Sequence, residues 1–283
     1  MSWTRPDAKS HDLLYVSNWI SGAVTIYTYP GGALAGMLTG FTQPYGECVD
    51  RGGDVFIANF NASDIVEYPH GSSRPIATIA DPGEHPSSCA IDPKTGALAV
   101  NNSYASGNKP GSVAIYRYGG AGSWGTPTLY SDWRFAYMYF CGYDASGNLF
   151  VDGTTVKGYS FLAELPAAAK KLVKIQLDQK INIPGGVQSD GNDMTIGDSA
   201  LNPAVIYRFT VSGDKGQVVG STTLDGNAAV VQYWIDGAKI VGPQPRSSTV
   251  TIWHYPAGGS PIQTISDSLD SPGGLTISPA PKL

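Results

Sequence analysis

Short apolar segments recur along the chain, and turns rich in glycine, proline, asparagine and aspartate separate them. Residues 44–58 (PYGECVDRGGDVFIA) contain two such segments on either side of a turn that begins at Asp50 and includes two glycines. Two strand-like segments joined by a tight turn predict a β-hairpin.

The first segment of this hairpin returns five times. Its copies are 86–92 (PSSCAID), 140–144 (FCGYD), 184–190 (PGGVQSD), 232–236 (QYWID) and 272–278 (PGGLTIS). The last residues of successive copies are 42 to 52 positions apart. Repeats of this length indicate a solenoid, a propeller or another array. Each period holds four strand-like segments, for example 44–50, 55–59, 65–68 and 75–79, which is typical of a propeller blade.

The two ends of the chain complement each other. The unit that contains residue 236 extends to residue 265, and only one strand-like segment, 273–278, follows it. Three strand-like segments precede residue 44. One C-terminal strand and three N-terminal strands complete a blade and leave no open sheet edge. We therefore expect an all-β protein, a six-bladed β-propeller with four antiparallel strands per blade. Residues 12–283 would form this single domain, preceded by a leader or tag remnant at 1–11.

The composition supports this fold and bears on which kinds of partner to expect. Charged residues make up 14% of the chain, which also contains 35 glycines and 20 prolines, a composition suited to short strands and tight turns. The net charge of −5 gives no electrostatic reason to expect nucleic acid or an anionic membrane. No apolar run is long enough to span a bilayer. We expect a monomer, exported with its leader removed; a cytoplasmic location is the alternative.

The three cysteines all occur in copies of the same segment. Cys48, Cys89 and Cys141 are odd in number and far apart, so we do not expect a disulfide framework. Buried cysteine behaves as a small apolar residue, which is the interpretation we favour. A reactive thiol or a metal ligand is the alternative.

The repeat resembles that of the NHL-repeat and gluconolactonase-like six-bladed propellers. Their units combine an apolar strand ending in Asp, a glycine turn and an apolar-aromatic strand, matched here by 44–59 (PYGECVDRGGDVFIAN) and 144–152 (DASGNLFVD). The resemblance covers nearly the whole chain. It implies a ligand site at the mouth of the propeller, where loops leading into the innermost strands meet loops leaving the second strands. It also implies a divalent cation that polarises an ester, lactone or phosphoester, as in gluconolactonase and paraoxonase relatives.

Carboxylate and amide oxygens in the mouth loops suit a hard cation such as Ca²⁺. Glu47 is the only acidic residue inside these copies of the innermost strand, which otherwise have an acidic residue only at their last position. With Asn59, Asn102 and Asp198 it forms the expected metal site for calcium or another divalent cation. Capping of nearby turns is the alternative for the Asn and Asp positions. His85 and Glu47 are the expected catalytic residues; a solvated loop is the alternative for His85.

Aromatic residues are also frequent in these loops. The expected ligand-binding residues are Trp19, Tyr45, Tyr104, Tyr137 and Tyr139. Aromatic rings can stack on a sugar or another flat ligand, and packing between blades is the alternative.

These residues predict a metal-dependent hydrolase of small esters, lactones or phosphoesters with its site at the axial mouth. The alternative is a non-catalytic module that binds a glycan, peptide or small molecule. A third possibility is lyase chemistry as in the related streptogramin lyase propellers, which requires paired His and Glu near a metal.

Overall fold

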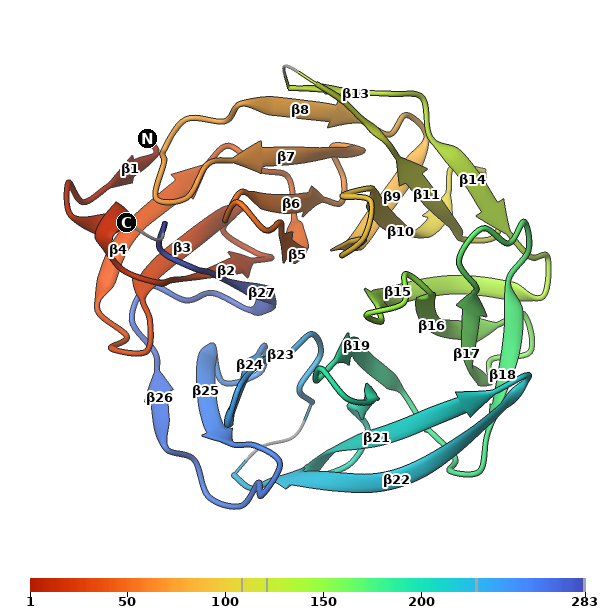
Figure 1. Ribbon diagram of the computed structural model, residues 1–283. Coiled ribbons are helices and arrows are strands. Elements are labelled where there is room, and N and C mark those ends of the chain that lie inside the picture. Colours follow the sequence, from red (N-terminus) through yellow and green to blue (C-terminus); the bar gives the residue numbers. More distant parts are fainter. Residues whose placement is uncertain (108, 121, 227–228, 282–283) are drawn as a thin grey trace.

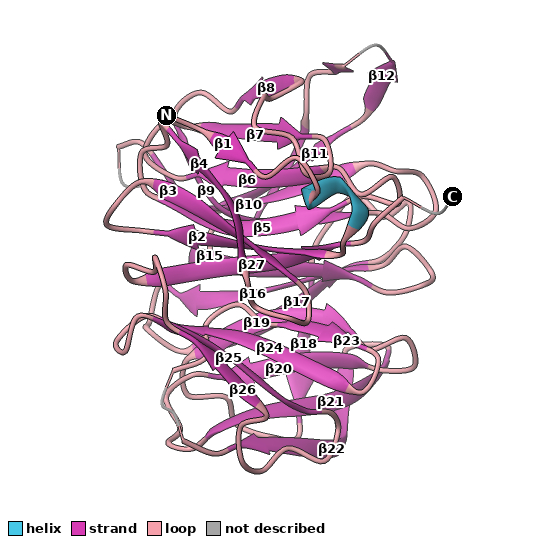
Figure 2. Ribbon diagram, turned by 90° about the vertical axis from the view of Figure 1, so that its left-hand side faces the viewer, coloured by secondary structure: helices cyan, strands magenta, loops and turns pink. Residues whose placement is uncertain are grey.

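Six blades of β-strands surround a central axis in the computed structural model of the chain, which describes residues 1–107, 109–120, 122–226 and 229–281 (Figure 1). Within each blade, the strands follow one another from the axis outward. The predicted six-bladed, all-β architecture is confirmed. Figure 2 shows the same blades from the side, with strands and loops making up nearly all of the described chain and η1 (Ala8–Ser10) as a short helix.

Blades 1 to 3 are built from the first half of the chain together with its last strand. In each of them, the strands run from the axis outward in the following order. Blade 1 contains β27 (Pro272–Ser278), β2 (Leu13–Asn18), β3 (Ala23–Thr28), β4 (Leu34–Thr39) and β1 (Trp3–Thr4). Blade 2 contains β5 (Pro44–Val49), β6 (Val55–Asn59), β7 (Asp64–Tyr68) and β8 (Ala77–Ala80). Blade 3 contains β9 (Glu84–Ile91), β10 (Leu98–Ala105), β11 (Ser112–Tyr116) and β14 (Thr128–Ser131). The connection from β11 to β14 forms a separate two-stranded pair, β12 (Tyr118–Gly120) and β13 (Ser123–Trp124).

Blades 4 to 6 follow the same order. Blade 4 contains β15 (Phe135–Tyr143), β16 (Leu149–Thr155), β17 (Ser160–Leu165) and β18 (Val173–Leu177). Blade 5 contains β19 (Pro184–Ser189), β20 (Met194–Asp198), β21 (Ala204–Ser212) and β22 (Lys215–Leu224). Blade 6 contains β23 (Trp234–Asp236), β24 (Lys239–Gln244), β25 (Thr249–His254) and β26 (Gln263–Ile265). The outer strands β18 and β22 also pair in parallel, which joins blades 4 and 5 at their rims.

Blade 1 closes the ring with strands from both ends of the chain. β27 pairs antiparallel with β2 from Leu13–Ser278 to Asn18–Pro272, as the complementary ends predict. Both termini accordingly lie beside this blade (Figure 1). The segment expected to be a leader or tag remnant contributes β1, which pairs with β4, and buries Ala8 among apolar side chains of blades 1 and 2.

Glycines of the repeated segment allow neighbouring blades to approach near the axis. A Cβ atom at Gly46 would lie 2.5 Å from the carbonyl oxygen of Ser87 on the next blade, and one at Gly142 would lie 2.4 Å from that of Val187. Both distances are too short for a side chain. At these two positions, a glycine is therefore required by backbone packing around the axis.

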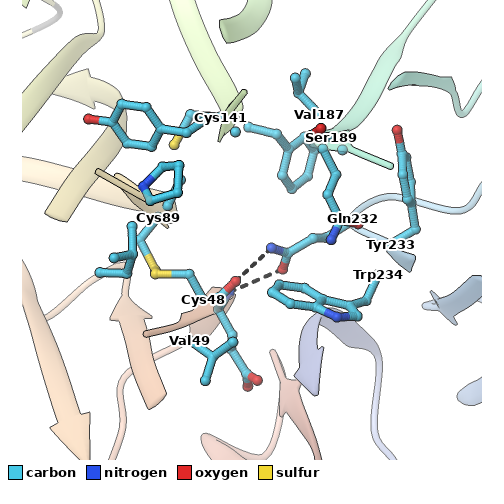
Figure 3. Close-up of a pocket in the computed structure, with 18 residues that line it drawn as sticks. Cys48, Val49, Cys89, Cys141, Val187, Ser189, Gln232, Tyr233 and Trp234 are labelled. Atoms are coloured by element: carbon cyan, nitrogen blue, oxygen red, sulfur yellow. Dashed lines mark hydrogen bonds between the residues drawn. A yellow bond between two sulfur atoms is a disulfide. The ribbon is translucent and has the colours of Figure 1, made fainter. Parts of the chain in front are cut away.

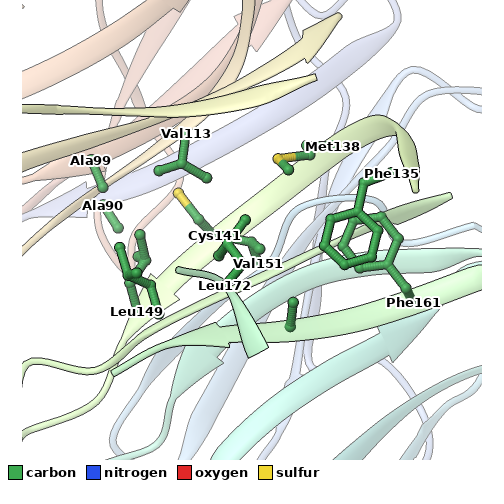
Figure 4. Packing of buried hydrophobic residues seen from close by; sticks show 12 residues of the cluster. Ala90, Ala99, Val113, Phe135, Met138, Cys141, Leu149, Val151, Phe161 and Leu172 are labelled. Carbon is green, nitrogen blue, oxygen red and sulfur yellow. The ribbon is translucent and has the colours of Figure 1, made fainter. Parts of the chain in front are cut away.

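The core consists of apolar layers between adjacent blades. Alternate residues of β17 face opposite neighbours: Phe161 packs toward blade 3 and Leu162 toward blade 5. In the layer between blades 3 and 4, the rings of Phe135 and Phe161 stack with centroids 3.8 Å apart (Figure 4). Burying a side chain of this size contributes roughly 1.5–3 kcal/mol.

A disulfide joins Cys48 on β5 to Cys89 on β9, with Cα atoms 5.5 Å apart, while Cys141 stays a free, buried thiol. The expectation that the cysteines form no disulfide is thus wrong for this pair. The two residues are 41 positions apart in sequence, one fewer than the terminal residues Asp50 and Asp92 of their copies, so their side chains face each other from neighbouring innermost strands. No helix of the described ranges is long and apolar enough to cross a membrane.

Candidate functional site

One end of the propeller carries a continuous set of aromatic side chains. We call this end the mouth face: the innermost strands begin there and the second strands end there. Trp19 follows β2, Tyr45 lies at the start of β5, and Phe60 follows β6. The Trp19 ring lies edge-to-face with both Tyr45 and Phe60, at centroid distances of 5.3 Å in each case. Such pairs contribute about 0.5–1.5 kcal/mol beyond area burial, so the three rings hold one another in place.

The aromatic set continues into blades 3 and 4. The His85 ring lies between those of Phe60 and Tyr104, with centroid distances of 5.1 Å and 4.2 Å. Tyr104 then meets Tyr137 edge-to-face at 6.0 Å. Strand ends and loops far apart in the sequence thus place their rings in one connected group.

A cavity of about 380 Å³ opens among the first of these rings. Its aromatic walls are Trp19, Tyr45, Phe60 and Tyr139. The remaining lining residues are small or apolar, namely Ser87, Ser103, Pro245, Ser271 and Gly273. The lining therefore combines ring faces with serine hydroxyls and includes no charged residue.

The backbone beneath the cavity is well anchored. The Ser87 hydroxyl lies 3.0 Å from the carbonyl oxygen of Asn101 and 2.9 Å from that of Tyr139, which ties blade 3 to blade 4. The Tyr139 hydroxyl is 3.1 Å from Thr154 Oγ1. Tyr139 is thus held at its backbone and at its hydroxyl.

Tyr45 is the most constrained of the cavity side chains. A Cβ atom at Gly273 would lie 2.6 Å from its ring, so the ring packs directly on the backbone of β27. Burial raises the pKa of Tyr45 to about 12, and the nearby Tyr139 and Asp152 add to the effect. The hydroxyl therefore stays protonated in neutral solution.

The structure brings three of the five predicted ligand-binding residues together at this cavity. Trp19, Tyr45 and Tyr139 line the cavity, whereas Tyr104 and Tyr137 extend the aromatic group away from it. Phe60 was not predicted, although its position directly after Asn59 in a mouth loop was a usable signal.

Asp152 is a buried residue of the mouth face that was not among the expected metal ligands or catalytic residues. Its Oδ1 accepts a hydrogen bond of 3.0 Å from the backbone N–H of Phe140, and its Oδ2 has no partner among the described residues. Burial raises the pKa of this carboxyl group well above its ordinary value. Burial thus disfavours the charged form of this carboxyl group.

Glu47 lies deep between blades 1 and 2. Its Oε1 accepts a hydrogen bond of 2.6 Å from Ser17 Oγ on β2, and its Oε2 has no hydrogen-bond partner in the described part of the chain. Burial raises its pKa to about 8, against the opposing effect of the Ser17 hydrogen bond. The side chain is therefore directed at the second strand of the neighbouring blade.

Asn59 and Asp198, two further expected metal ligands, accept hydrogen bonds from residues of their own blades. Asn59 Oδ1 accepts from the N–H of Thr42 at 2.7 Å. Asp198 accepts from the N–H and the side-chain amide of Asn182, at 2.9 and 2.8 Å. In both cases, the end of a second strand is tied to the loop leading into the innermost strand of the same blade, as the capping alternative predicts.

Asn102 and His85 also contact other residues of blade 3. The side-chain amide of Asn102 donates to Ser112 Oγ at 3.3 Å. His85 stacks on Tyr104, and its buried Nδ1 has no partner among the described residues. His85 lines neither the aromatic cavity nor the cavity on the propeller axis.

This axial cavity is the smaller of the two, at about 200 Å³ (Figure 3). Gln232 crosses its edge: the side-chain Nε2 donates to the Glu47 carbonyl at 2.8 Å, and Oε1 accepts from the Glu47 N–H at 3.1 Å. Cys48, Cys89 and Cys141 also line this cavity. Burial raises the pKa of the Cys141 thiol to about 12, which disfavours the nucleophilic thiolate.

Glu47, Asn59, Asn102 and Asp198 each form hydrogen bonds with a different residue of the fold. Across the described ranges, no group of three or more His, Cys, Asp or Glu side chains is placed to hold a metal ion. The divalent cation therefore stays an expectation drawn from the resemblance.

Comparison with known proteins supports the fold. The sequence matches no protein-family model and no curated protein. A chain in the crystal structure of the nidogen/laminin complex superposes with a TM-score of 0.74 at 12% identity, covering 96% of this chain and 99% of the other. A protein of unknown function from Bacteroides caccae gives a TM-score of 0.70 at 11% identity, covering 95% of this chain and 99% of the other.

A functionally unknown protein from Desulfotomaculum acetoxidans is similar over 96% of this chain and 100% of its own, with a TM-score of 0.64 at 11% identity. At such low identity the likeness shows the fold alone. The protein is a β-propeller, and one propeller scaffold carries many activities.

Proposed function

We propose that the protein is a binding propeller whose mouth-face cavity takes an uncharged ligand with a flat ring, such as a sugar or a small aromatic molecule. The observation that carries the proposal is the cavity of about 380 Å³ walled by Trp19, Tyr45, Phe60 and Tyr139. Small-molecule sites typically measure 300–1,000 Å³ and combine aromatic walls with few polar groups.

The lining selects against charged ligands. Besides the Trp19 indole N–H and the Tyr45 and Tyr139 hydroxyls, its polar side-chain groups are the hydroxyls of Ser87, Ser103 and Ser271. A charged group that entered this cavity would lose its hydration without gaining an ion pair. A neutral ring, by contrast, gains stacking on the aromatic walls and hydrogen bonds to hydroxyls.

The site is also organised before any ligand arrives. The rings of Trp19, Tyr45 and Phe60 contact one another, and the Tyr139 hydroxyl is within hydrogen-bond distance of Thr154. Less side-chain freedom remains to be lost on binding, which favours affinity.

Hydrolysis is the second proposal, and it rests on the resemblance to gluconolactonase-like propellers. One observation favours it: Glu47 lines the axial cavity, and its Oε2 has no partner among the described residues. It ranks second because the oxygens of Asn59 and Asp198 already accept hydrogen bonds within their blades.

The test is a titration with neutral methyl glycosides and neutral bicyclic aromatic compounds, followed by tryptophan fluorescence and ligand-observed NMR. We expect saturable binding that Trp19→Ala weakens by about tenfold, equivalent to about 1.4 kcal/mol. The matched control is Trp133→Ala, because Trp133 is 76% exposed and lies outside the cavity.

Equal affinity in wild type and Trp19→Ala would contradict the binding proposal. Turnover of a lactone or ester that is lost both on chelation and in Glu47→Gln would favour the hydrolase instead. We expect binding to be indifferent to chelators.

A further inference from the structure

Glu164 is a buried carboxylate without a partner, on the third strand of blade 4. It is 9% exposed, and its carboxylate takes part in no hydrogen bond or ion pair with the described residues. It is two positions after Leu162, so both side chains face blade 5. Its carboxylate oxygens are not themselves fully buried, so they face a space that a compensating cation can enter.

Blade 2 offers an internal comparison. Glu67 pairs with Phe56 on β6 as Glu164 pairs with Phe150 on β16, so the two glutamates occupy equivalent positions. Glu67 Oε2 accepts a hydrogen bond of 3.0 Å from Trp124 Nε1. The fold thus supplies a donor at one of these positions and leaves the other for a group from outside.

Glu164 lines a cavity of about 470 Å³ between blades 4 and 5. The cavity lies where the innermost strands end, opposite the mouth face. Asp144 and Asp193, from the two turns that follow β15 and β19, add carboxylates to the lining. Lysine and arginine are not among the residues that line it. Burial raises the pKa of Glu164, and the Asp144 carboxylate adds to the effect.

The same cavity has an apolar wall. Phe150, Met194 and Phe209 line it beside Glu164, and the two phenyl rings meet edge-to-face at 5.9 Å. A cation with a hydrocarbon stem matches both parts, because its charge meets the carboxylates and its stem packs on the accessible edges of Phe150 and Met194.

We propose that this cavity binds an organic cation, an ammonium or guanidinium group on a short alkyl stem, through Glu164. An inorganic ion fits less well, because no three acidic side chains of the described chain are grouped closely enough to coordinate one. A guanidinium or ammonium group forms charge-assisted hydrogen bonds with a single buried carboxylate and needs no such cluster.

The test uses n-butylguanidinium as the probe and n-butylurea as its neutral counterpart, with binding followed by amide NMR shifts and calorimetry. We expect saturable binding of n-butylguanidinium to the wild-type protein, and at least about tenfold weaker binding of n-butylurea. Glu164→Gln keeps the size of the side chain and should weaken n-butylguanidinium binding by at least about tenfold. Glu67→Gln is the matched control and should leave it unchanged.

Three results would overturn the proposal. They are no saturable binding up to about 10 mM probe, equal binding by Glu164→Gln, and displacement of the probe by Ca²⁺ at a lower concentration than the probe itself requires. A blocked Gly-Arg-Gly peptide, titrated in parallel, distinguishes the source of the cation: tighter binding than n-butylguanidinium indicates an arginine of a protein partner, and weaker binding indicates a free small cation.

Discussion

Ser17 on blade 1 donates a hydrogen bond of 2.6 Å to Glu47 on blade 2, and this contact links the two blades through a carboxyl group that is fully buried. Because burial raises the pKa of Glu47 to about 8, the group is mostly protonated near pH 7. The residue that looked most like a metal ligand in the sequence therefore acts in the fold as a neutral link between blades.

The first prediction concerns the pH dependence that Glu47 imposes. Its pKa rises from 4.5 in the unfolded chain to about 8 on folding, so folding takes up a proton in this interval. Stability should fall by about 1.4 kcal/mol per pH unit as the pH increases from about 5 to about 8. Glu47→Gln removes this contribution, and urea unfolding should show a flatter profile for the variant. Asp214→Asn, at an exposed position, should retain the wild-type slope; an unchanged slope in Glu47→Gln would disprove the assignment.

The second prediction concerns the Cys48–Cys89 disulfide. Closing a loop of this length, with a sequence separation of 41, restricts the unfolded chain and should contribute about 4 kcal/mol. Cys48→Ser should lower the free energy of unfolding by roughly 2–4 kcal/mol. A thiol assay on denatured, unreduced wild-type protein should detect one thiol, from Cys141. Three thiols would show that the bond does not form.

The third prediction separates capping from metal binding at Asp198. This carboxylate accepts hydrogen bonds from Asn182, Ile183 and Ala200, so Asp198→Ala leaves several donors without a partner. We expect a loss of roughly 2–4 kcal/mol in urea unfolding. The loss should be the same with added Ca²⁺ or with a chelator. Wild-type stability that rises with Ca²⁺, with no such response in the variant, would instead support a metal role.

The fourth prediction tests how β27 positions the cavity ring of Tyr45. A methyl group at Gly273 would meet this ring at 2.6 Å, so Gly273→Ala should displace it and cost about 1–3 kcal/mol. Ligand affinity at the mouth face should fall together with stability. Gly125→Ala is the control, because its nearest neighbour there, the Arg117 carbonyl oxygen, is 3.6 Å away. Unchanged affinity in Gly273→Ala would place the ligand away from Tyr45.

The repeat alone was enough to predict the blades and their closure. Strand pairing is local within a blade, so strands, turns and glycines recur in a readable order along the chain. The same order identifies the mouth loops, and three of the five predicted aromatic residues line the cavity there. Phe60 could have been added on the same grounds.

Contacts between blades were decided only by the tertiary structure. Cys48 and Cys89 meet because adjacent innermost strands converge near the axis, although 41 positions separate them in sequence. Glu47 turns toward Ser17 because side chains alternate along β5, and a list of polar residues does not reveal which neighbour each one faces. The sequence by itself therefore determined the architecture and the face of the site, whereas the partner of each buried polar group depended on how the blades pack against one another.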